Sequence, residues 1–370
     1  MKIDFTALPT YDGKIQVSFD GGQSFKDYNV SDVRESGISL EDSQDYEKIK
    51  IQGPANLLQN LNVISKIGAR SDDDLLPEDI TGIVLKDFKV RFDKSLLQKY
   101  PKLTSVTIPE GVTTIGNGAF KDCSSLTSIT IPEGVTSISY AVFENCSSLT
   151  SITIPDSVTA IGGNAFRGCT SLTSINIPDS ITFIGDSAFL GCSSLTSITI
   201  PEGVTTIGNS AFWRCTGLTS INIPDSITSI DAFAFYNCSS LTDVTIPNNV
   251  TSIGYTAFAG CSSLISINIP NNVTSIGGSA FANCKKLTSI TIPNSVTSIS
   301  SHAFYNCSNL TNITIPASVT LIDDNTCNSC SKLKTINYEG TEEQWNAISK
   351  GDNWNKGCPS DMVINYNYQG

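Results

Sequence analysis

One spacing recurs along most of this chain and limits its fold more than any other feature. Leucine returns every 23 residues, and the register does not slip. Proline, phenylalanine and cysteine recur at the same interval. Strict self-similarity at a period of about 20 to 50 residues is typical of arrays in which each unit forms one coil. The leucines are Leu103, Leu126, Leu149, Leu172, Leu195, Leu218, Leu241, Leu264, Leu287, Leu310 and Leu333.

Each unit divides into three short segments. In the unit at 126–148, the segment LTSITI predicts a short strand with one buried face, because apolar and β-branched polar residues alternate. Pro132 ends this strand because proline lacks an N–H donor. Val135 and Ile138 indicate a second short extended stretch. The Ala-Phe-x-x-Cys segment, as at 165–169, predicts a brief helical or 3₁₀ turn.

Stacking is required because one such coil cannot bury its own apolar edge. Coils about 4.8 Å apart would bury a continuous core, with each apolar side chain on its copy in the next coil. Both ends of such an array need caps. Residues 80–338 are predicted to form the solenoid, with 80–102 as a degenerate N-terminal cap coil. Residues 339–370 are predicted to form the C-terminal cap, with a short helix at 340–348.

The cysteines fit this arrangement. The ten from Cys123 to Cys330 share one column and are predicted to be free, buried thiols, because parallel stacked side chains point the wrong way for disulfides. Cys327 and Cys358 leave alternatives open. They could form a disulfide that staples the C-terminal cap, or join Cys330 in a metal site, for which a lone CxxC motif is weak support.

The N-terminal residues follow a different sequence pattern from the repeats. Residues 1–52 predict a small β module, because polar and apolar residues alternate around Asp20-Gly21-Gly22, a hairpin signal. Residues 53–79 are predicted to be a linker, with a possible helix at 55–67. The segment from Ser18 to Phe25 resembles an Asp-box, the hairpin turn of sialidase propellers. A propeller needs several copies, so a structural turn is the expectation.

The complete repeat carries a family resemblance. The pattern Leu-x-x-Ile-x-Ile-Pro-x-x-Val-x-x-Ile-Gly-x-x-Ala-Phe-x-x-Cys resembles the BspA-like, treponemal-type leucine-rich repeats, and INYEGTEEQWNAI resembles that family's C-terminal unit. The resemblance covers about 80–350. It implies a leucine-rich-repeat solenoid, a curved right-handed array of 23-residue coils. It also implies microbial surface proteins that bind host proteins or other cells, without enzymatic activity.

Net charge and hydropathy limit the classes of partner and the cellular locations that fit the sequence. A net charge of −12 argues against nucleic acid and anionic membranes, because phosphates require clustered lysine and arginine. No apolar run reaches the ~18 residues of a transmembrane helix. The N-terminus lacks the apolar region of a secretory signal. Another export route, a trimmed signal and an internal location are all compatible with this, and the resemblance favours an extracellular or cell-surface location.

No residue pattern indicates catalysis, a cofactor or a resident metal. The only histidine, His302, occupies a variable column that holds Gly118, Asn164 and Ser210 in other coils. General acid-base chemistry would need converging irregular side chains. We therefore expect a loop histidine and no catalytic residue.

Two surface features depart from the plain polar template. The first is an acidic edge after the proline, which could solubilise the protein, hold Ca²⁺ or recognise a basic partner. Its members are Glu110, Glu133, Asp156, Asp179, Glu202 and Asp225. The second is a candidate interaction patch of large apolar residues, which indicates either local packing or partner contact. Its members are Phe183, Leu190, Trp213, Phe233, Tyr236 and Tyr255.

These features predict a binding protein. The solenoid would present a surface for protein or glycan recognition, in adhesion or in interaction with a host or another cell. The alternative is a structural spacer or tip of a larger assembly, anchored by the N-terminal module.

Overall fold

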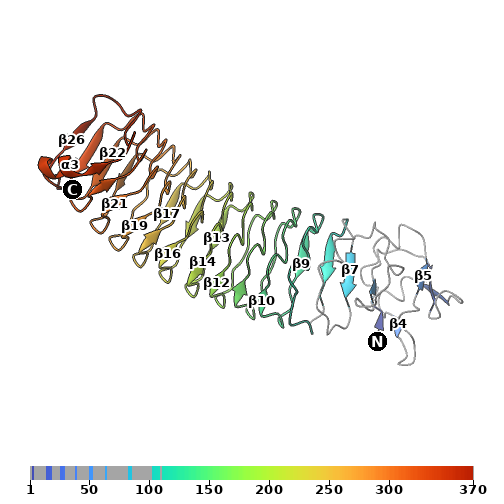
Figure 1. The fold of residues 1–370 in the computed structure, drawn as a ribbon. Helices are drawn as coiled ribbons and strands as arrows, with labels where there is room; N and C mark the ends of the chain where they lie inside the picture. The colour runs from blue at the N-terminus through green and yellow to red at the C-terminus, as the bar shows by residue number, and fades with distance from the viewer. Residues whose placement is uncertain are drawn as a thin grey trace.

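The protein is a long stack of similar coils. The computed structural model describes residues 102–108 and 111–369, together with short strands earlier in the chain. Successive coils lie side by side along one axis, with the C-terminal helix at the far end (Figure 1). Each regular coil contributes two short strand segments and a turn region. The predicted parallel solenoid with a 23-residue repeat is therefore confirmed for the described part.

The first strand of each coil pairs in parallel with its counterpart one repeat later. Ile221, for example, stands opposite Val244. Single-residue bridges at Thr153, Asn176 and Asn268 continue the pairing where no full strand forms. The strands of this series are β6 (Val63–Ile64), β7 (Gly82–Leu85), β8 (Ser105–Thr107), β9 (Ser128–Thr130), β13 (Ser197–Thr199), β15 (Ser220–Asn222), β17 (Asp243–Thr245), β20 (Ser289–Thr291), β22 (Asn312–Ile315), β24 (Thr335–Tyr338) and β26 (Val363–Asn365).

The second strand follows the proline turn. In one coil this turn is closed by the N–H of Val204, which donates to the carbonyl of Pro201 at 3.0 Å. The proline thus ends the first strand, as predicted. The strands of this series are β10 (Ser137–Ile138), β11 (Ala160–Ile161), β12 (Phe183–Ile184), β14 (Thr206–Ile207), β16 (Ser229–Ile230), β18 (Ser252–Ile253), β19 (Ser275–Ile276), β21 (Ser298–Ile299), β23 (Leu321–Ile322) and β25 (Ser349–Lys350).

The turn region differs from the predicted helical or 3₁₀ turn, and that prediction is wrong. The N–H of Leu190 does donate to the carbonyl of Ser187 at 3.1 Å. However, Ser187 and Gly191 have left-handed φ values of 56° and 76°, and a left-handed residue ends a right-handed helix. Consecutive β-turns form instead. They direct alternate N–H groups at the next coil, where the N–H of Phe189 donates to the carbonyl of Ala211 at 2.8 Å.

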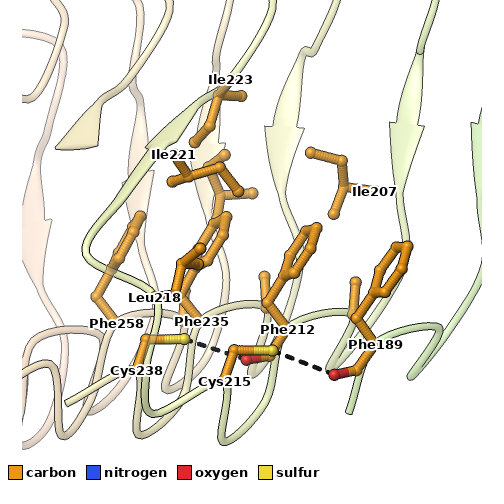
Figure 2. Packing of buried hydrophobic residues seen from close by; sticks show 14 of the residues in the cluster. Phe189, Ile207, Phe212, Cys215, Leu218, Ile221, Ile223, Phe235, Cys238 and Phe258 are labelled. Carbon is orange, nitrogen blue, oxygen red and sulfur yellow. Dashed lines mark hydrogen bonds between the residues drawn. The ribbon is translucent and has the colours of Figure 1, made fainter. Parts of the chain in front are cut away.

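A stack of phenylalanines runs through the interior. Neighbouring ring centroids lie between 5.2 and 5.8 Å apart, with interplanar angles of 12° or less. Figure 2 shows Phe189, Phe212 and Phe235 stacked beneath the apolar side chains of the strands. Each ring packs on identical rings above and below, so this stack helps to hold the register of the coils. Its members are Phe120, Phe143, Phe166, Phe189, Phe212, Phe235, Phe258, Phe281 and Phe304, all fully buried.

The cysteine column is a ladder of thiols, which confirms the prediction of free, buried cysteines. The Sγ of Cys238 donates to the carbonyl of Phe212 at 3.1 Å, and that of Cys215 to Phe189 at 3.1 Å (Figure 2). Burial raises the pKa of Cys238 to about 12. The Cys238 thiol therefore remains protonated near neutral pH and acts as a hydrogen-bond donor between coils.

Cys358 extends this ladder and does not pair with Cys327. Its Sγ lies 3.3 Å from the carbonyl oxygen of Cys327, which matches the contact of Cys330 with the carbonyl of Phe304 at 3.1 Å. Both Cys327 and Cys358 carry free thiols in this structure. The disulfide considered for the C-terminal cap is therefore absent here.

Hydroxyl groups link the coils at the surface. The Oγ1 of Thr173 donates to the carbonyl of Thr150 at 3.3 Å, and that of Thr205 to Thr182 at 3.3 Å. Each hydroxyl thus bonds to the residue one repeat earlier. Ile265 interrupts the first of these columns. The abundance of threonine and serine therefore has a structural cause that needs no ligand.

The C-terminal region holds a further coil with a helix inserted into it. Helix α3 (Glu342–Ala347) confirms the helix predicted at 340–348. Strands β25 and β26 then rejoin the two series, with Leu321 opposite Ser349 and Thr335 opposite Val363. The predicted cap at 339–370 is thus partly an additional, longer repeat.

Helix α3 begins with a capping box, which gives a test of this region. The N–H of Gln344 donates to the Oγ1 of Thr341 at 3.3 Å, and the N–H of Thr341 donates to the Oε1 of Gln344 at 2.8 Å. We predict that Thr341→Ala lowers the free energy of unfolding by about 1 kcal/mol, because a helix N–H loses its acceptor. Chemical denaturation measures the change. Thr341→Ser keeps the acceptor, so an equal loss in that variant would contradict the explanation.

The N-terminal predictions fall largely outside the described residues. Strands β2 (Lys14–Ser18) and β3 (Lys26–Asn29) pair antiparallel on either side of the predicted hairpin turn, and β2 also pairs with β5 (Lys50–Gln52). Strand β1 (Lys2–Ile3) pairs antiparallel with β4 (Ile38–Ser39). The β module at 1–52 as a unit remains a prediction.

The cap coil and the linker are described only in their strands. Strand β7 pairs in parallel with β8, with Ile83 opposite Val106, as expected for a cap coil at 80–102. Of the helix predicted at 55–67, only β6 lies within the described residues, and it is a strand paired with β7. The other residues of the linker at 53–79 lie outside the described residues.

Candidate functional site

Four of the six predicted patch residues form one group of touching rings, called here the aromatic cluster: Trp213, Phe233, Tyr236 and Tyr255. Trp213 stacks on Phe233, with ring centroids 5.4 Å apart and an interplanar angle of 16°. Tyr236 meets Trp213 edge-on at 5.3 Å and Phe233 at 5.9 Å. Tyr255 meets Phe233 edge-on at 5.4 Å. Three consecutive coils thus join their rings on one side of the solenoid.

Exposure varies across the aromatic cluster. Tyr255 is 54% exposed, whereas Trp213, Phe233 and Tyr236 are half-buried. The column of residues that directly follows the core phenylalanine, to which Trp213 and Tyr236 belong, is therefore only partly exposed, and Ala259 of the next coil is buried in it. The cluster packs on itself and still presents ring surface to solvent.

Two features of the cluster lower the stability of the fold. The Nε1 of Trp213 is buried and has no hydrogen-bond partner, the only such side-chain nitrogen or oxygen in the described part of the chain. An unsatisfied buried donor costs about 1–3 kcal/mol. Phe233 occupies a left-handed backbone position, with φ of 57°. Left-handed backbone is strained for a bulky residue and costs about 1–2 kcal/mol.

The other two predicted patch residues stand apart from these rings. Phe183 lies on β12 in the second strand series, is 43% exposed and has no ring contact within the described residues. Leu190 is half-buried in the coil before Trp213, and the N–H of Gly191 donates to the carbonyl of Trp213 at 2.7 Å. Leu190 therefore borders the cluster, whereas Phe183 is a separate exposed apolar residue.

The acidic edge is a row of solvated side chains. Glu110 lies outside the described residues, and no ion pair joins the other five to a cation of the described part of the chain. The N–H of Asp225 donates to the Oε2 of Glu202 at 3.3 Å. Within the described ranges, no group of three or more His, Cys, Asp or Glu side chains is arranged to hold a metal ion. The exposed members are Glu133, Asp156, Asp179, Glu202 and Asp225.

Sequence reasoning missed a charged group in the column that also holds Trp213. The carboxylate of Glu144 is almost fully buried between two cations. Its Oε2 lies 2.6 Å from the Nζ of Lys121, and its Oε1 lies 3.6 Å from the Nη1 of Arg167. The hydrogen bond that Lys121 donates to Glu144 raises the pKa of Lys121. A positive, a negative and a positive residue at successive 23-residue intervals is the sequence signal that could have predicted this charged group.

His302 lies in the turn region, at a left-handed position with φ of 59°. Its Nδ1 is 2.6 Å from the Oγ of Ser301, and its ring lies 5.5 Å from that of Tyr305.

The flat strand face carries a regular row of threonine and asparagine, mostly exposed. No helix among the described residues has the length and hydropathy needed to cross a bilayer.

Comparison with known proteins places the repeats in a family. The sequence matches the model of the BspA type leucine rich repeat region, in six copies, over residues 91–219, 161–287 and 251–349. These matches span more than two thirds of the chain. Among curated proteins, no significant match is found.

Solved bacterial structures share the architecture. A leucine-rich repeat protein from Bacteroides ovatus is 24% identical over 89% of this chain and 97% of its own, with a TM-score of 0.59. A leucine-rich repeat protein from Eubacterium ventriosum is 24% identical over 76% and 89%, with a TM-score of 0.50. A leucine rich cell surface protein from Faecalibacterium prausnitzii is 31% identical over 78% and 91%, with a TM-score of 0.47. By its repeats, this chain belongs to the BspA type leucine rich repeat family.

Proposed function

We propose that this chain is a non-enzymatic binding protein that is displayed outside the cell and recognises a protein or glycan through the aromatic cluster. One observation supports this most strongly. The cluster combines a buried, unpaired Trp213 N–H with a left-handed Phe233, and both features reduce stability. Local departures from good packing are expected at functional sites, where another requirement outweighs stability.

A purely structural role would favour other residues. Leucine or phenylalanine at position 213 would fill the same space without leaving a buried donor unpaired. Asparagine or glycine at position 233 would relax the backbone, as Asn164 and Gly118 do in the same column of other coils. Tryptophan and tyrosine are enriched among the residues that contribute most to binding at protein interfaces. Contact with a partner accounts for the choice of residues better than packing does.

The strand face of the described coils carries no comparable group of touching aromatic rings. The strand face carries small side chains that are nearly the same from coil to coil and, apart from Asp243, uncharged in these strands, and its hydroxyl columns already serve the fold. A rigid stack of coils needs little ordering on binding, so a modest cluster can give useful affinity. Display at the cell surface belongs to the proposal because the family resemblance implies it. Labelling intact cells with an antibody to the solenoid would test it, and signal only after lysis would count against it.

The binding test uses the double variant Trp213→Ser/Tyr236→Ser. We predict at least about tenfold weaker binding to a partner captured by the native chain from host surface proteins or a glycan array, because the cluster loses two rings. Surface plasmon resonance measures the affinity, and circular dichroism checks the fold. Tyr140→Ser is the matched control, because Tyr140 is 55% exposed and lies outside the cluster.

The outcomes separate binding from packing. Loss of the folded circular dichroism signal in the double variant would show that the rings belong to the core. Unchanged affinity in a folded double variant would reject the aromatic cluster as the binding site.

A further inference from the structure

The chemistry around the aromatic cluster indicates what it binds. Resting on the proposed function, we infer that the cluster receives a cationic side chain, arginine or lysine, presented by a protein partner. A cation near the face of an aromatic ring is attracted by the negative charge of the π system, most strongly when water is partly excluded. The inference depends on ring geometry, on local charge and on a similar contact elsewhere in this chain.

The rings present faces in more than one direction. Phe233 and Tyr255 meet at 75°, and Trp213 and Tyr236 at 67°, so adjacent faces are nearly perpendicular. The ring of Tyr255 lies along the next coil at Gly278, where an added Cβ would stand 3.5 Å from its Cδ2. More than half of Tyr255 remains exposed. A cation at this site could therefore contact a ring face beside the edge of another ring.

The net charge of the coils that carry the cluster favours a cation over an anion. Between Gly168 and Cys284, six carboxylates are accompanied by a single cationic side chain, Arg214. The next cationic side chains along the sequence are Arg167, directly before this stretch, and Lys285, directly after it. The electrostatic field of such a stretch attracts basic partners and repels acidic ones. The six carboxylates are those of Asp179, Asp186, Glu202, Asp225, Asp231 and Asp243.

The same chain already contains the proposed contact near its C-terminus. The Nζ of Lys350 lies 4.7 Å from the centroid of the Trp345 ring, and it also donates to the carbonyl of Trp345 at 2.6 Å. No lysine or arginine of the described residues lies over a ring of the aromatic cluster in this way. The cluster thus offers ring faces in an acidic setting without an internal cation of its own.

The test compares a charged peptide with a neutral one of almost the same shape. The probe is an acetylated, amidated octapeptide of alternating glycine and arginine, and its counterpart carries citrulline, which replaces each guanidinium by an uncharged urea group. Calorimetric titration of the full chain at about 150 mM salt, where weak surface attraction is screened, gives both affinities. We expect the arginine peptide to bind at least about tenfold more tightly.

Variants of Tyr255 then identify the ring contribution. Tyr255→Leu keeps apolar area but removes the π face, so the ratio of the two affinities should fall at least about threefold. Tyr255→Phe keeps the ring and should preserve the ratio. Tyr140→Leu is the matched control: Tyr140 is 55% exposed and lies along Gly163 as Tyr255 lies along Gly278, but it is outside the cluster. It too should leave the ratio unchanged.

Two results would overturn the inference. Equal affinity for the two peptides would exclude recognition of the cation. A preference for arginine that survives Tyr255→Leu would assign the attraction to the carboxylates alone. In either case, weaker partner binding by the Trp213→Ser/Tyr236→Ser variant would still uphold the proposed function, so the two failures are distinguishable.

Discussion

Raising the pH from 8 to 10 is expected to remove several kcal/mol from the free energy of unfolding. Burial raises the pKa of Cys123, Cys169 and Cys238 from 9.0 to about 12. The folded state holds these protons more tightly than the unfolded state does. The stabilisation is therefore complete below pH 9 and is lost as the pH rises toward 12. Each such thiol accounts for roughly 1.4 kcal/mol at pH 10.

Urea denaturation at pH 8, 9 and 10 under reducing conditions measures this loss. Measurements stay at or below pH 10 because burial also raises the pKa of Tyr338, which would add to the loss at higher pH. Cys238→Ala removes one titrating group. The slope of its free energy of unfolding against pH should therefore be smaller than that of the native chain by the equivalent of about one proton. A decline of the same steepness in Cys238→Ala would show that other groups cause the alkaline effect.

Phe212→Ala is expected to lower the free energy of unfolding by about 3–5 kcal/mol. The ring is fully buried and stacks at 5.4 Å on Phe189 and at 5.6 Å on Phe235. Its removal leaves a cavity between two rigid coils, and neighbouring coils cannot move inward without breaking their backbone hydrogen bonds. Denaturant titration monitored by circular dichroism measures the change.

Phe183→Ala is the matched control for this prediction. Phe183 comes from the preceding repeat, is 43% exposed and makes no ring contact in the described part of the chain. Its removal should change stability by no more than about 0.5 kcal/mol, as is usual at surface positions. Similar losses in the two variants would mean that the phenylalanine stack does not dominate the core.

The coil register could be predicted because one observation is repeated many times. Leu126, Ile129 and Phe143 each recur at fixed spacing, and only stacking of identical coils buries all of them together. The free thiols followed from the same stacking. Because the same position is apolar in many coils, a single unusual residue in one coil does not change the prediction that this position is buried.

The turn region could not be predicted because its backbone is set by bonds between coils. Gly118, Asn164, Phe233 and His302 share one left-handed position but have little chemistry in common. Glycine and asparagine suggest such a backbone, whereas phenylalanine argues against it. The alternate N–H groups that donate to the next coil decide the conformation, and these partners become visible only after the coils are stacked.

The candidate site was predicted in part. The 23-residue period placed Leu190, Trp213 and Tyr236 in one column, so their proximity followed from the repeat. Their half-burial depends on how adjacent columns pack, as the contact of Trp213 with Phe233 shows. Phe183 was included because it is an unusual residue in its column, but that column lies on another side of the coil.

The ladder of contacts between successive coils also determines how such a protein can grow over evolutionary time. Within the described part of the chain, each coil bonds to the one before and the one after, as Cys238 does with Phe212. A duplicated unit inserted after Cys284 would find suitable neighbours on both sides and would lengthen the molecule by about 4.8 Å. The aromatic cluster would keep all its contacts. Gene duplication can therefore change the distance between the aromatic cluster and the C-terminal end without changes to the residues of the core.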